Sequence, residues 1–543
     1  MKQVLIIGSG ISGMACALRC AEHGIHAELV SPYPSERAQS VMAAGGINAV
    51  LHAEDGDSVE CHIRDTLKGG AMLGGEQAVT GLCTAAQEII RYLERIGTVF
   101  SLDAAGKPAR RAFGGQSFRR TYFCGASTGK QIVSAMVMEV RRFEAAGLIR
   151  RRLRYTFHSA LLHEGRCCGA LLFDEGSGHL EAVTADALIL ATGGQNALFG
   201  KTTGSTLCNG YAAGKLFLQG AALKNLEFIQ YHPTTLETPQ KRMLISEAVR
   251  GEGGRLFYEE NGERRYFMEE RYGERGNLMT RDVIAREIER AGKPVFLDIA
   301  FLGQEQIGKR LPEVRDICQK YRGIDISREP IPVAPSVHFF MGGLAVHRNH
   351  ETSLRGVFAI GECASMYHGA NRLGGNSLLS AIYSGWVAAD EIAGRTSDAA
   401  GGDFSRECER EDALLQQSLQ TESRFPVMYI RDMLAETMRE DLGIVREQKH
   451  LEKGLSDIDY LLSVAEQIRY DSSVQPYDNY SLTGILTLAK AVLTCALSRT
   501  ESCGAHYRSD FPEADGSQGY ATLISYSGGA FRTSLDKDGS YEN

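Results

Sequence analysis

The chain has 543 residues, 43% of them hydrophobic and 23% charged, and its formal net charge is −8. This length predicts roughly two to four domains, and the composition is typical of a soluble globular enzyme. The charge is spread along the chain, which disfavours a nucleic-acid-binding role because such proteins concentrate basic residues in a patch. The 13 cysteines contain no Cys-x-x-Cys pair, so we expect reduced thiols and no metal site, whether zinc or iron–sulfur. Any electrons that the protein transfers must therefore come from a partner or a small donor.

The N-terminus predicts a dinucleotide-binding βαβ unit. A strand over residues 4–7 is followed by G-x-G-x-x-G at residues 8–13, a helix to about residue 23 and a second strand ending near residue 30. Glycines at these positions let the backbone N–H groups at a helix N-terminus hold a pyrophosphate. The second strand ends in Ser31 instead of the usual acid, so ribose recognition must differ from the simplest pattern. The glycines also break the apolar run, which fits this unit better than a signal peptide.

Two further junctions between a strand and glycines lie far apart, at residues 187–194 and 356–361. Because such junctions can converge on one nucleotide, they predict a large FAD-binding domain that is interrupted by an insertion. From about residue 404 the apolar residues recur with a helical period, and the segment beyond 500 is irregular and polar. The predicted fold class is therefore α/β, with a Rossmann-like FAD-binding domain (1–226 and 347–403), an inserted α+β capping domain (227–346), a helical domain (404–500) and an irregular C-terminal tail (501–543).

One glycine-rich loop combines a cation with the start of a helix. Residues 368–382 form a loop that becomes a helix near Asn376, with Arg372 just before the turn. Glycine allows close approach of the backbone, and a helix start carries free N–H groups and partial positive charge. A guanidinium suits a carboxylate and the helix start suits an electron-rich ring. We hypothesise that a substrate anion and a flavin meet here.

Other candidate residues leave a structural alternative open. Glu247 and Arg250 are spaced i,i+3, and spacing alone favours a salt bridge on one helix face. Arg281 lies in the first turn of a predicted helix, where a cation opposes the local dipole. His338 is a lone histidine in an apolar strand and fits a hydrogen-bonded core residue. The basic residues at 110–121 favour a solvated loop, because exposed charge is the default.

The order of these motifs resembles the flavoprotein subunit of succinate dehydrogenase and fumarate reductase, in whose superfamily L-aspartate oxidase is a relative. The resemblance is colinear from the first residue to about residue 511 and so covers most of the chain. Its most specific parts are Phe113-Gly-Gly115 with Arg120-Thr121, Gln230-Tyr-His232-Pro, Ser246-Glu247 through Arg250-Gly-Glu-Gly-Gly254, Arg281-Asp282, His338 with Met341-Gly-Gly343, and Gly369-Ala-Asn-Arg372 through Asn376-Ser-Leu-Leu379.

The resemblance implies an FAD-dependent oxidoreductase that acts on a CH–CH group. Hydride would pass between flavin N5 and a four-carbon dicarboxylate, with Arg281 as the proton donor and Glu247 and Arg250 as its relay. The residues implied to bind the substrate, fumarate or succinate, are Phe113, His232, Ser246, His338 and Arg372. Those implied to surround FAD are Gly8, Gly10, Ser12, Gly13, Ser31, Ser40, Gly45, Gly46, Gly194, Glu362, Asn376, Ser377 and Leu378.

Two positions depart from the family pattern. In the membrane-bound complexes that the chain resembles, a histidine in the loop corresponding to residues 37–46 attaches FAD covalently, and Gln39 stands there. Glutamine cannot form this bond, so we expect non-covalent FAD. A covalent bond raises the flavin potential, and its absence biases the expected activity toward fumarate reduction. Cys503 stands where the family usually has arginine, which leaves the contact with a partner open.

L-aspartate oxidase is the main alternative, because it also lacks the covalent histidine. Its pattern has an acid at the position of Phe113 to meet the substrate amine, whereas phenylalanine offers an ammonium only a weak π-face contact. This difference favours the reductase. A reductase of another unsaturated carboxylate would keep the same site. A non-catalytic flavin-binding subunit is disfavoured by the intact set of His232, Glu247, Arg281 and Arg372.

The expected partners follow from the same resemblance. Besides the small dicarboxylate, they are an iron–sulfur subunit with a membrane anchor, or a soluble electron donor. No uninterrupted apolar segment reaches about 18 residues, so we expect no membrane span in this chain. The expected location is the cytoplasm, or the inner face of the cell membrane where a partner holds the protein there.

Overall fold

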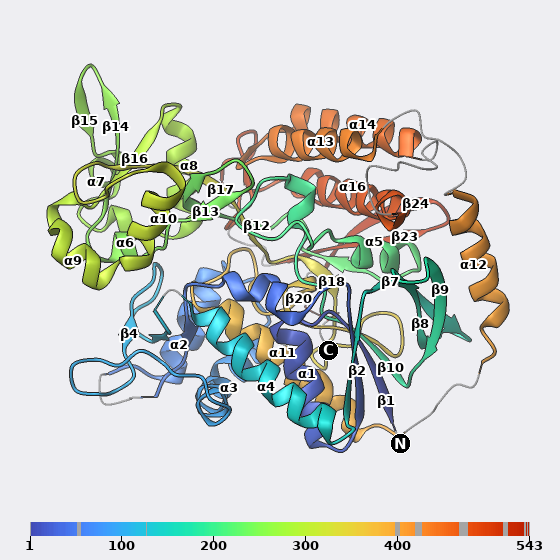
Figure 1. The fold of residues 1–543 in the computed structure, drawn as a ribbon. Helices are drawn as coiled ribbons and strands as arrows, with labels where there is room; N and C mark the ends of the chain where they lie inside the picture. Colours follow the sequence, from blue (N-terminus) through green and yellow to red (C-terminus); the bar gives the residue numbers. More distant parts are fainter. Residues whose placement is uncertain are drawn as a thin grey trace.

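A five-stranded parallel sheet forms the centre of the FAD-binding domain (Figure 1). The computed structural model describes residues 2–51, 56–125, 127–396, 402–418, 426–465, 476–513, 520–536, 539 and 541. The strand order is β19-β10-β1-β2-β6, so strands from three distant segments meet side by side. Their bounds are β1 (Gln3–Ile7), β2 (His26–Ser31), β6 (Ile149–Leu153), β10 (Ala187–Leu190) and β19 (Val357–Ala359).

Helices and a second sheet cover the two faces of this parallel sheet (Figure 1). Helices α1 (Ile11–Glu22), α4 (Thr128–Ala145) and α11 (Asn376–Gly394) pack together on one face. The antiparallel strands β7 (Tyr155–His163), β8 (Arg166–Asp174) and β9 (His179–Thr184) pack on the other. The strands of such a sheet are nearly continuous apolar runs because both faces of the sheet are buried. Strands β1 and β10 show this pattern.

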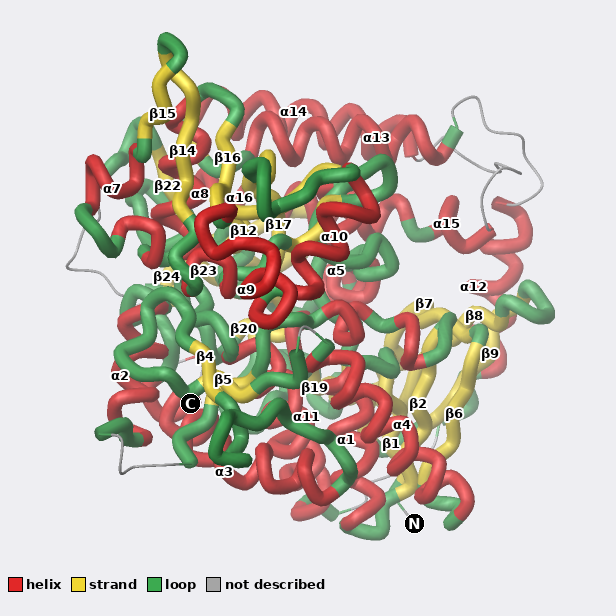
Figure 2. Tube along the Cα trace, turned by 60° about the vertical axis from the view of Figure 1, so that its left-hand side comes forward, coloured by secondary structure: helices red, strands yellow, loops and turns green. Residues whose placement is uncertain are grey.

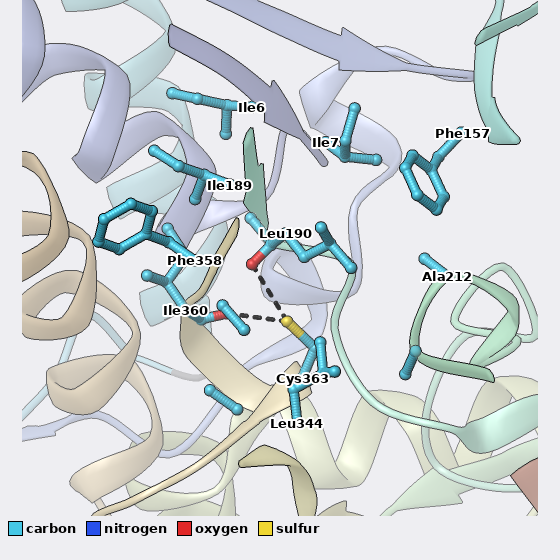
Figure 3. Packing of buried hydrophobic residues seen from close by; sticks show 14 of the residues in the cluster. Ile6, Ile7, Phe157, Ile189, Leu190, Ala212, Leu344, Phe358, Ile360 and Cys363 are labelled. Carbon is cyan, nitrogen blue, oxygen red and sulfur yellow. Dashed lines mark hydrogen bonds between the residues drawn. The ribbon is translucent and has the colours of Figure 1, made fainter. Parts of the chain in front are cut away.

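The core under the sheet joins these distant segments. Figure 3 shows Ile6, Ile189 and Phe358 from three neighbouring strands packed together. The Sγ of Cys363 lies 3.2 Å from the carbonyl oxygens of both Leu190 and Ile360, which share its single proton. The remaining helices and short strands of this half are α2 (Val59–Gly69), α3 (Glu76–Arg95), α5 (Tyr211–Leu218), β3 (Ile47–Asn48), β4 (Arg110–Arg111) and β5 (Thr121–Tyr122).

The capping segment has a sheet and a core of its own, at the upper left of Figure 1. Its sheet has the order β13-β12-β17-β16-β14-β15, and its core residues all lie between Leu236 and Val333. The strands are β12 (Ile229–Glu237), β13 (Arg242–Leu244), β14 (Arg255–Glu260), β15 (Glu263–Arg265), β16 (Val295–Asp298) and β17 (Ile331–Phe340). Its helices are α6 (Ala248–Gly251), α7 (Phe267–Tyr272), α8 (Arg281–Ala291), α9 (Gly303–Arg310) and α10 (Pro312–Arg322).

The helical domain packs over α5 and beside the capping segment, as Figures 1 and 2 show. It contains α12 (Ser405–Ser418), α13 (Val427–Thr437), α14 (Gln448–Ala465), α15 (Pro476–Tyr480) and α16 (Leu482–Ser498). Among the described residues, one helical stretch, Tyr477–Ser498, is long and apolar enough to cross a membrane, and 72% of its apolar window is buried inside the protein. Its apolar character is therefore accounted for by packing in the core.

The C-terminal tail contains more regular structure than we expected. Strands β23 (Ala521–Ser527) and β24 (Ala530–Asp536) form a hairpin. The hairpin supplies two strands of a five-stranded sheet, in which β23 pairs with β11 (Leu223–Lys224), next to β18 (Gly343–Ala345) and β20 (Ala364–Ser365). The tail looks polar in sequence because β24 is an edge strand with mostly exposed side chains.

Candidate active site

One cavity of about 1020 Å³ runs between the parallel sheet, the capping segment and the helical domain. At one end it is bordered by the β1–α1 turn and the end of β2. At the other end it reaches the residues that we expected to bind a substrate. Of the predicted residues, it is lined by Gly8, Gly10, Ser12, Ser31, Ser40, Gly45, Gly46, Phe113, His232, Ser246, Glu247, Arg281, His338, Glu362, Arg372, Ser377 and Leu378. It is not lined by Gly13, Gly194, Arg250 or Asn376.

The β1–α1 turn has the close backbone packing that a dinucleotide site requires. Gly8 has φ +114°, and a Cβ on Gly13 would lie 2.0 Å from the Gly8 carbonyl oxygen. Gly13 therefore permits tight packing of helix on strand and does not face the cavity. A Cβ on Gly10 would meet nothing closer than the Ser40 hydroxyl at 3.4 Å, which leaves its backbone open toward the cavity. The residues present fit the pyrophosphate of FAD.

The start of α11 faces the other end of the cavity. Gly375 has φ +86°, and a Cβ there would lie 2.1 Å from Asn48 Oδ1. The side chain of Asn376 is used entirely within the protein: its Nδ2 donates to Thr66 Oγ1 at 3.0 Å, and its Oδ1 accepts from Asn48 at 2.7 Å. Asn376 therefore fixes the loop with its side chain and does not line the cavity, whereas Ser377 and Leu378 do. Its contact with the cofactor stays a prediction. The helix N-terminus suits negative charge on a flavin ring.

Gly194 and Glu362 pack against each other at the cavity's middle. A Cβ on Gly194 would lie 2.7 Å from Glu362 Oε1, so glycine is needed there for packing. That oxygen accepts from the backbone N–H of Phe340 at 3.1 Å. Burial raises the pKa of Glu362 to about 7, so its carboxyl can be neutral and donate a hydrogen bond to a cofactor hydroxyl.

Two arginines from different domains meet on one glutamine. The Oε1 of Gln230 accepts from Arg281 Nη1 at 3.0 Å and from Arg372 Nη2 at 2.9 Å. Its Nε2 donates to Asn371 Oδ1 and to the Arg372 carbonyl. Arg372 is 4% exposed, and its Nε has no partner among the described residues. Burial and then Arg281 lower the pKa of Arg372 to about 9. A carboxylate bound beside it would stabilise the charged guanidinium.

Glu247 connects Arg281 to Arg250. Glu247 Oε2 accepts from Arg281 Nε at 3.0 Å, and Oε1 lies 3.8 Å from Arg250 Nη2. Burial would raise the pKa of Glu247, but Arg281 and Arg250 outweigh it, and the pKa is lowered. Arg250 is buried behind this carboxylate and reaches the carbonyl of Asn277 at 2.8 Å. The i,i+3 pair is thus a salt bridge, and its carboxylate also touches the cavity.

Two histidines from neighbouring strands face each other across the site. The rings of His232 on β12 and His338 on β17 are 5.2 Å apart in an edge-to-face arrangement. Burial, followed by nearby arginines, lowers both pKa values well below the usual range. The two rings are therefore neutral at physiological pH and offer hydrogen bonds without competing with Arg281 for a proton. His338 belongs to the cavity and not to the apolar core.

Phe113 lines the cavity and packs against glycines of two loops. It is 5% exposed, and its ring lies 3.4 Å from the position of a Cβ on Gly45 and close to Gly374. The basic loop at residues 110–121, which we expected to be solvated, is buried in part. Arg120 is 1% exposed and donates to Asp57 and Asp65 at 2.7–2.9 Å. Its carboxylate partners lie on the preceding segment, so the pairing could not be found from the loop alone.

The fold and its matches to known families define an FAD-dependent oxidoreductase. The FAD binding domain model matches residues 3–378, and the model for the fumarate reductase flavoprotein C-terminus matches residues 431–536. The chain belongs to the succinate dehydrogenase and fumarate reductase flavoprotein family, whose members act on a CH–CH group.

Relatives align over nearly the whole chain. It is 33% identical to the succinate dehydrogenase flavoprotein subunit of Bacillus subtilis, over 96% of this chain and 93% of the relative. It is 35% identical to one subunit of the fumarate reductase (CoM/CoB) of Methanothermobacter marburgensis, over 94% of each chain. A structure titled quinol-fumarate reductase with menaquinol molecules matches with a TM-score of 0.90 and 29% identity, over 98% of both chains.

Proposed function

We propose that the protein interconverts fumarate and succinate and is biased toward fumarate reduction. The observation that carries this proposal is the set of donors around one cavity: Arg281, the unpartnered Nε of Arg372, and the neutral rings of His232 and His338. Glu247 is ion-paired with Arg281, whereas Arg372 has no ion pair among the described residues, so the cavity carries an excess of positive charge beside Gln230. A dianion with carboxylates at both ends would neutralise this excess and satisfy the buried donors.

The donors would fix the substrate at both ends. Arg372 and the two histidines would hold the carboxylates, with Ser246 at the cavity wall, and Phe113 would press the carbon chain toward the flavin end. Rigid donors at both ends place the C=C bond in one orientation, and this positioning contributes to the rate of hydride transfer. FAD, when bound, supplies or accepts the hydride. Twisting one carboxylate out of conjugation would make the alkene more electrophilic, at a cost in strain.

Arg281 would donate the proton to the second carbon. A guanidinium is a very weak acid, so the transfer requires prompt reprotonation. Glu247 lies 3.0 Å from Arg281 and 3.8 Å from Arg250, which supports a relay from Arg250 through Glu247. The contact of Glu247 with the Gly114 N–H at 2.7 Å keeps the carboxylate oriented toward Arg281.

The same cavity disfavours aspartate as a substrate. Phe113 offers no acid to pair with an ammonium group, and the cations around it would repel one. A reductase of another unsaturated carboxylate uses the same donors, so the acid must be decided by assay.

Electrons would come from a partner. The described residues contain no group of three or more His, Cys, Asp or Glu side chains that could hold a metal ion. The family resemblance implies an iron–sulfur subunit with a membrane anchor, or a soluble donor, as that partner. The match to a quinol-fumarate reductase supports electron delivery from a quinol, and the CoM/CoB relative supports a different donor. The proposed location is cytoplasmic, or peripheral at the membrane through that partner.

Non-covalent binding of FAD is proposed because of Gln39. Gln39 lines the cavity in the loop beside Ser40, and its Oε1 is buried without a partner among the described residues. A carboxamide accepts a hydrogen bond but does not form a stable bond to the flavin ring. Acid precipitation of the purified holoenzyme should release the flavin into the supernatant. A protein pellet that retains yellow colour after washing would contradict non-covalent binding.

The function is tested with purified protein and two assays. Reduced viologen with fumarate should be consumed rapidly, whereas aspartate with oxygen should give no product. Crotonate, which has one carboxylate, serves as a matched substrate control and should react poorly because half of the donors stay unpaired. Activity in the assay with aspartate and oxygen, but not in the assay with fumarate, would overturn the proposal.

A further inference from the structure

Thr203 contacts the histidine at one side of the site from a loop of the FAD-binding domain. Its Oγ1 lies 2.8 Å from His338 Nδ1 and 3.1 Å from the Val337 carbonyl oxygen. Its backbone N–H also donates to that carbonyl at 3.2 Å. Thr203 is 7% exposed and lines the same cavity as His338. It was not among the residues expected from the sequence.

A hydroxyl has one proton, so these contacts allow two arrangements. If the hydroxyl donates to Val337, it accepts from Nδ1–H, and Nε2 of the neutral ring is a bare acceptor. If it donates to Nδ1, the ring carries its proton on Nε2 and becomes a donor. Both arrangements use the 2.8 Å contact between Oγ1 and Nδ1, and the first also uses the 3.1 Å contact with Val337. The second arrangement leaves the Val337 carbonyl with the backbone N–H of Thr203, so no buried group loses its partner. It alone gives the ring an Nε2–H that a carboxylate can accept.

His232 has a parallel arrangement. The N–H of Thr234 lies 3.3 Å from His232 Nδ1. The Thr234 carbonyl lies 3.1 Å from Nδ1 but already accepts from the Ile245 N–H at 3.1 Å. An acceptor role for Nδ1 satisfies the Thr234 N–H and places the proton on Nε2. Both rings can thus turn an N–H toward a ligand in the cavity, as a carboxylate requires.

We propose that Thr203 is a positioning residue whose hydroxyl donates to His338 Nδ1 and so holds His338 in the Nε2–H form that binds one carboxylate of the substrate. This inference rests on the proposed function, because it needs a dianion in the cavity. The effect is on binding of the substrate and of the transition state alike, so KM should change more than kcat.

Three variants of the holoenzyme test the proposal. Thr203→Val removes the hydroxyl and keeps the shape, and it should raise the KM for fumarate and the Kd for succinate about tenfold, the scale of one hydrogen bond to a charged group. kcat should stay within about threefold. Thr203→Ser keeps the hydroxyl and should restore binding to within about twofold of wild type. Thr235→Val is the matched control: Thr235 is also buried, and its hydroxyl donates to the Ala334 carbonyl at 2.6 Å instead of to a histidine.

A double-variant cycle separates positioning from general structural damage. In a His338→Ala background, Thr203→Val should add no further loss of succinate binding. The inference is overturned if Thr203→Val binds succinate like wild type, or if its loss is the same with and without His338. If Thr203→Val does not retain FAD, Thr203→Ala takes its place in the same comparison with Thr203→Ser. Wild-type protein that binds neither succinate nor fumarate would instead overturn the proposed function.

Discussion

At the scale of single residues, the site depends on a glutamine that brings two like charges together. Gln230 Oε1 accepts from both Arg281 and Arg372. Burial lowers the pKa of Arg372, and repulsion from Arg281 adds to this effect. The carbonyl dipole of Gln230 partly offsets that repulsion. In the sequence, Gln230 is recognisable only as part of a motif. Its contacts with both arginines form only in the folded protein, where the two segments that carry Arg281 and Arg372 lie side by side. The signal that could have found it is its place two residues before His232 on the same strand.

Arg281→Lys should reduce fumarate turnover by about 10²- to 10⁴-fold, the range for loss of a general acid, while FAD is retained. Lysine has no fork of donors, so it cannot contact Gln230 and Glu247 together as Arg281 does. The measurement is the steady-state rate with reduced viologen and saturating fumarate. Arg286→Lys is the control on the same helix, where the residue makes a looser 3.8 Å ion pair with Asp282. Near-normal turnover in Arg281→Lys would contradict the assignment.

At the scale of elements, local signals were predictable and long-range pairings were not. The β1–α1 turn and the two later strand–glycine junctions follow from glycines next to apolar runs, and they occur as expected in β1, β10 and β19. The C-terminal hairpin was missed because Ile524 pairs with Leu223, about 300 residues earlier. A polar edge strand shows no alternation of apolar and polar residues from which such a pairing could be predicted. Burial of Arg120 was missed for the same reason.

Two ion pairs of Arg120 connect the loop that carries Phe113 to α2 and the residues just before it. Arg120 donates to Asp65 on that helix and to Asp57 just before it. Arg120→Met should leave two buried carboxylates unpaired and cost about 3–5 kcal/mol of stability. Melting of the holoenzyme, followed by flavin fluorescence, should occur at a clearly lower temperature. Arg119→Met changes the exposed neighbour and should melt like wild type. Equal melting temperatures for the two variants would refute a structural role for the buried pair.

At the scale of the whole molecule, several buried histidines make the fold sensitive to mild acid. Burial lowers the pKa of His62 and His350 to about 4 and that of His368 to about 3, and His232 and His338 follow the same direction. In the unfolded chain these rings titrate near about 6.5. Between that pH and the folded-state pKa values the unfolded state binds more protons, so stability is present above pH 6.5 and is lost as the pH falls.

Each such ring should remove about 1.4 kcal/mol of stability per pH unit below about 6.5. The melting temperature of the holoenzyme should therefore fall steeply between about pH 6.5 and 5, before carboxylates titrate near about 4. His350→Gln tests one ring outside the cavity, where Nδ1 is held by the Ala359 carbonyl at 2.8 Å, and its melting curve should fall less steeply with pH. His163→Gln changes an exposed histidine, with 53% of its side chain exposed, and should keep the wild-type slope. A melting temperature that is constant from pH 7 to 5 would contradict the burial of these rings in neutral form, and with it the neutral donors on which the substrate site is built.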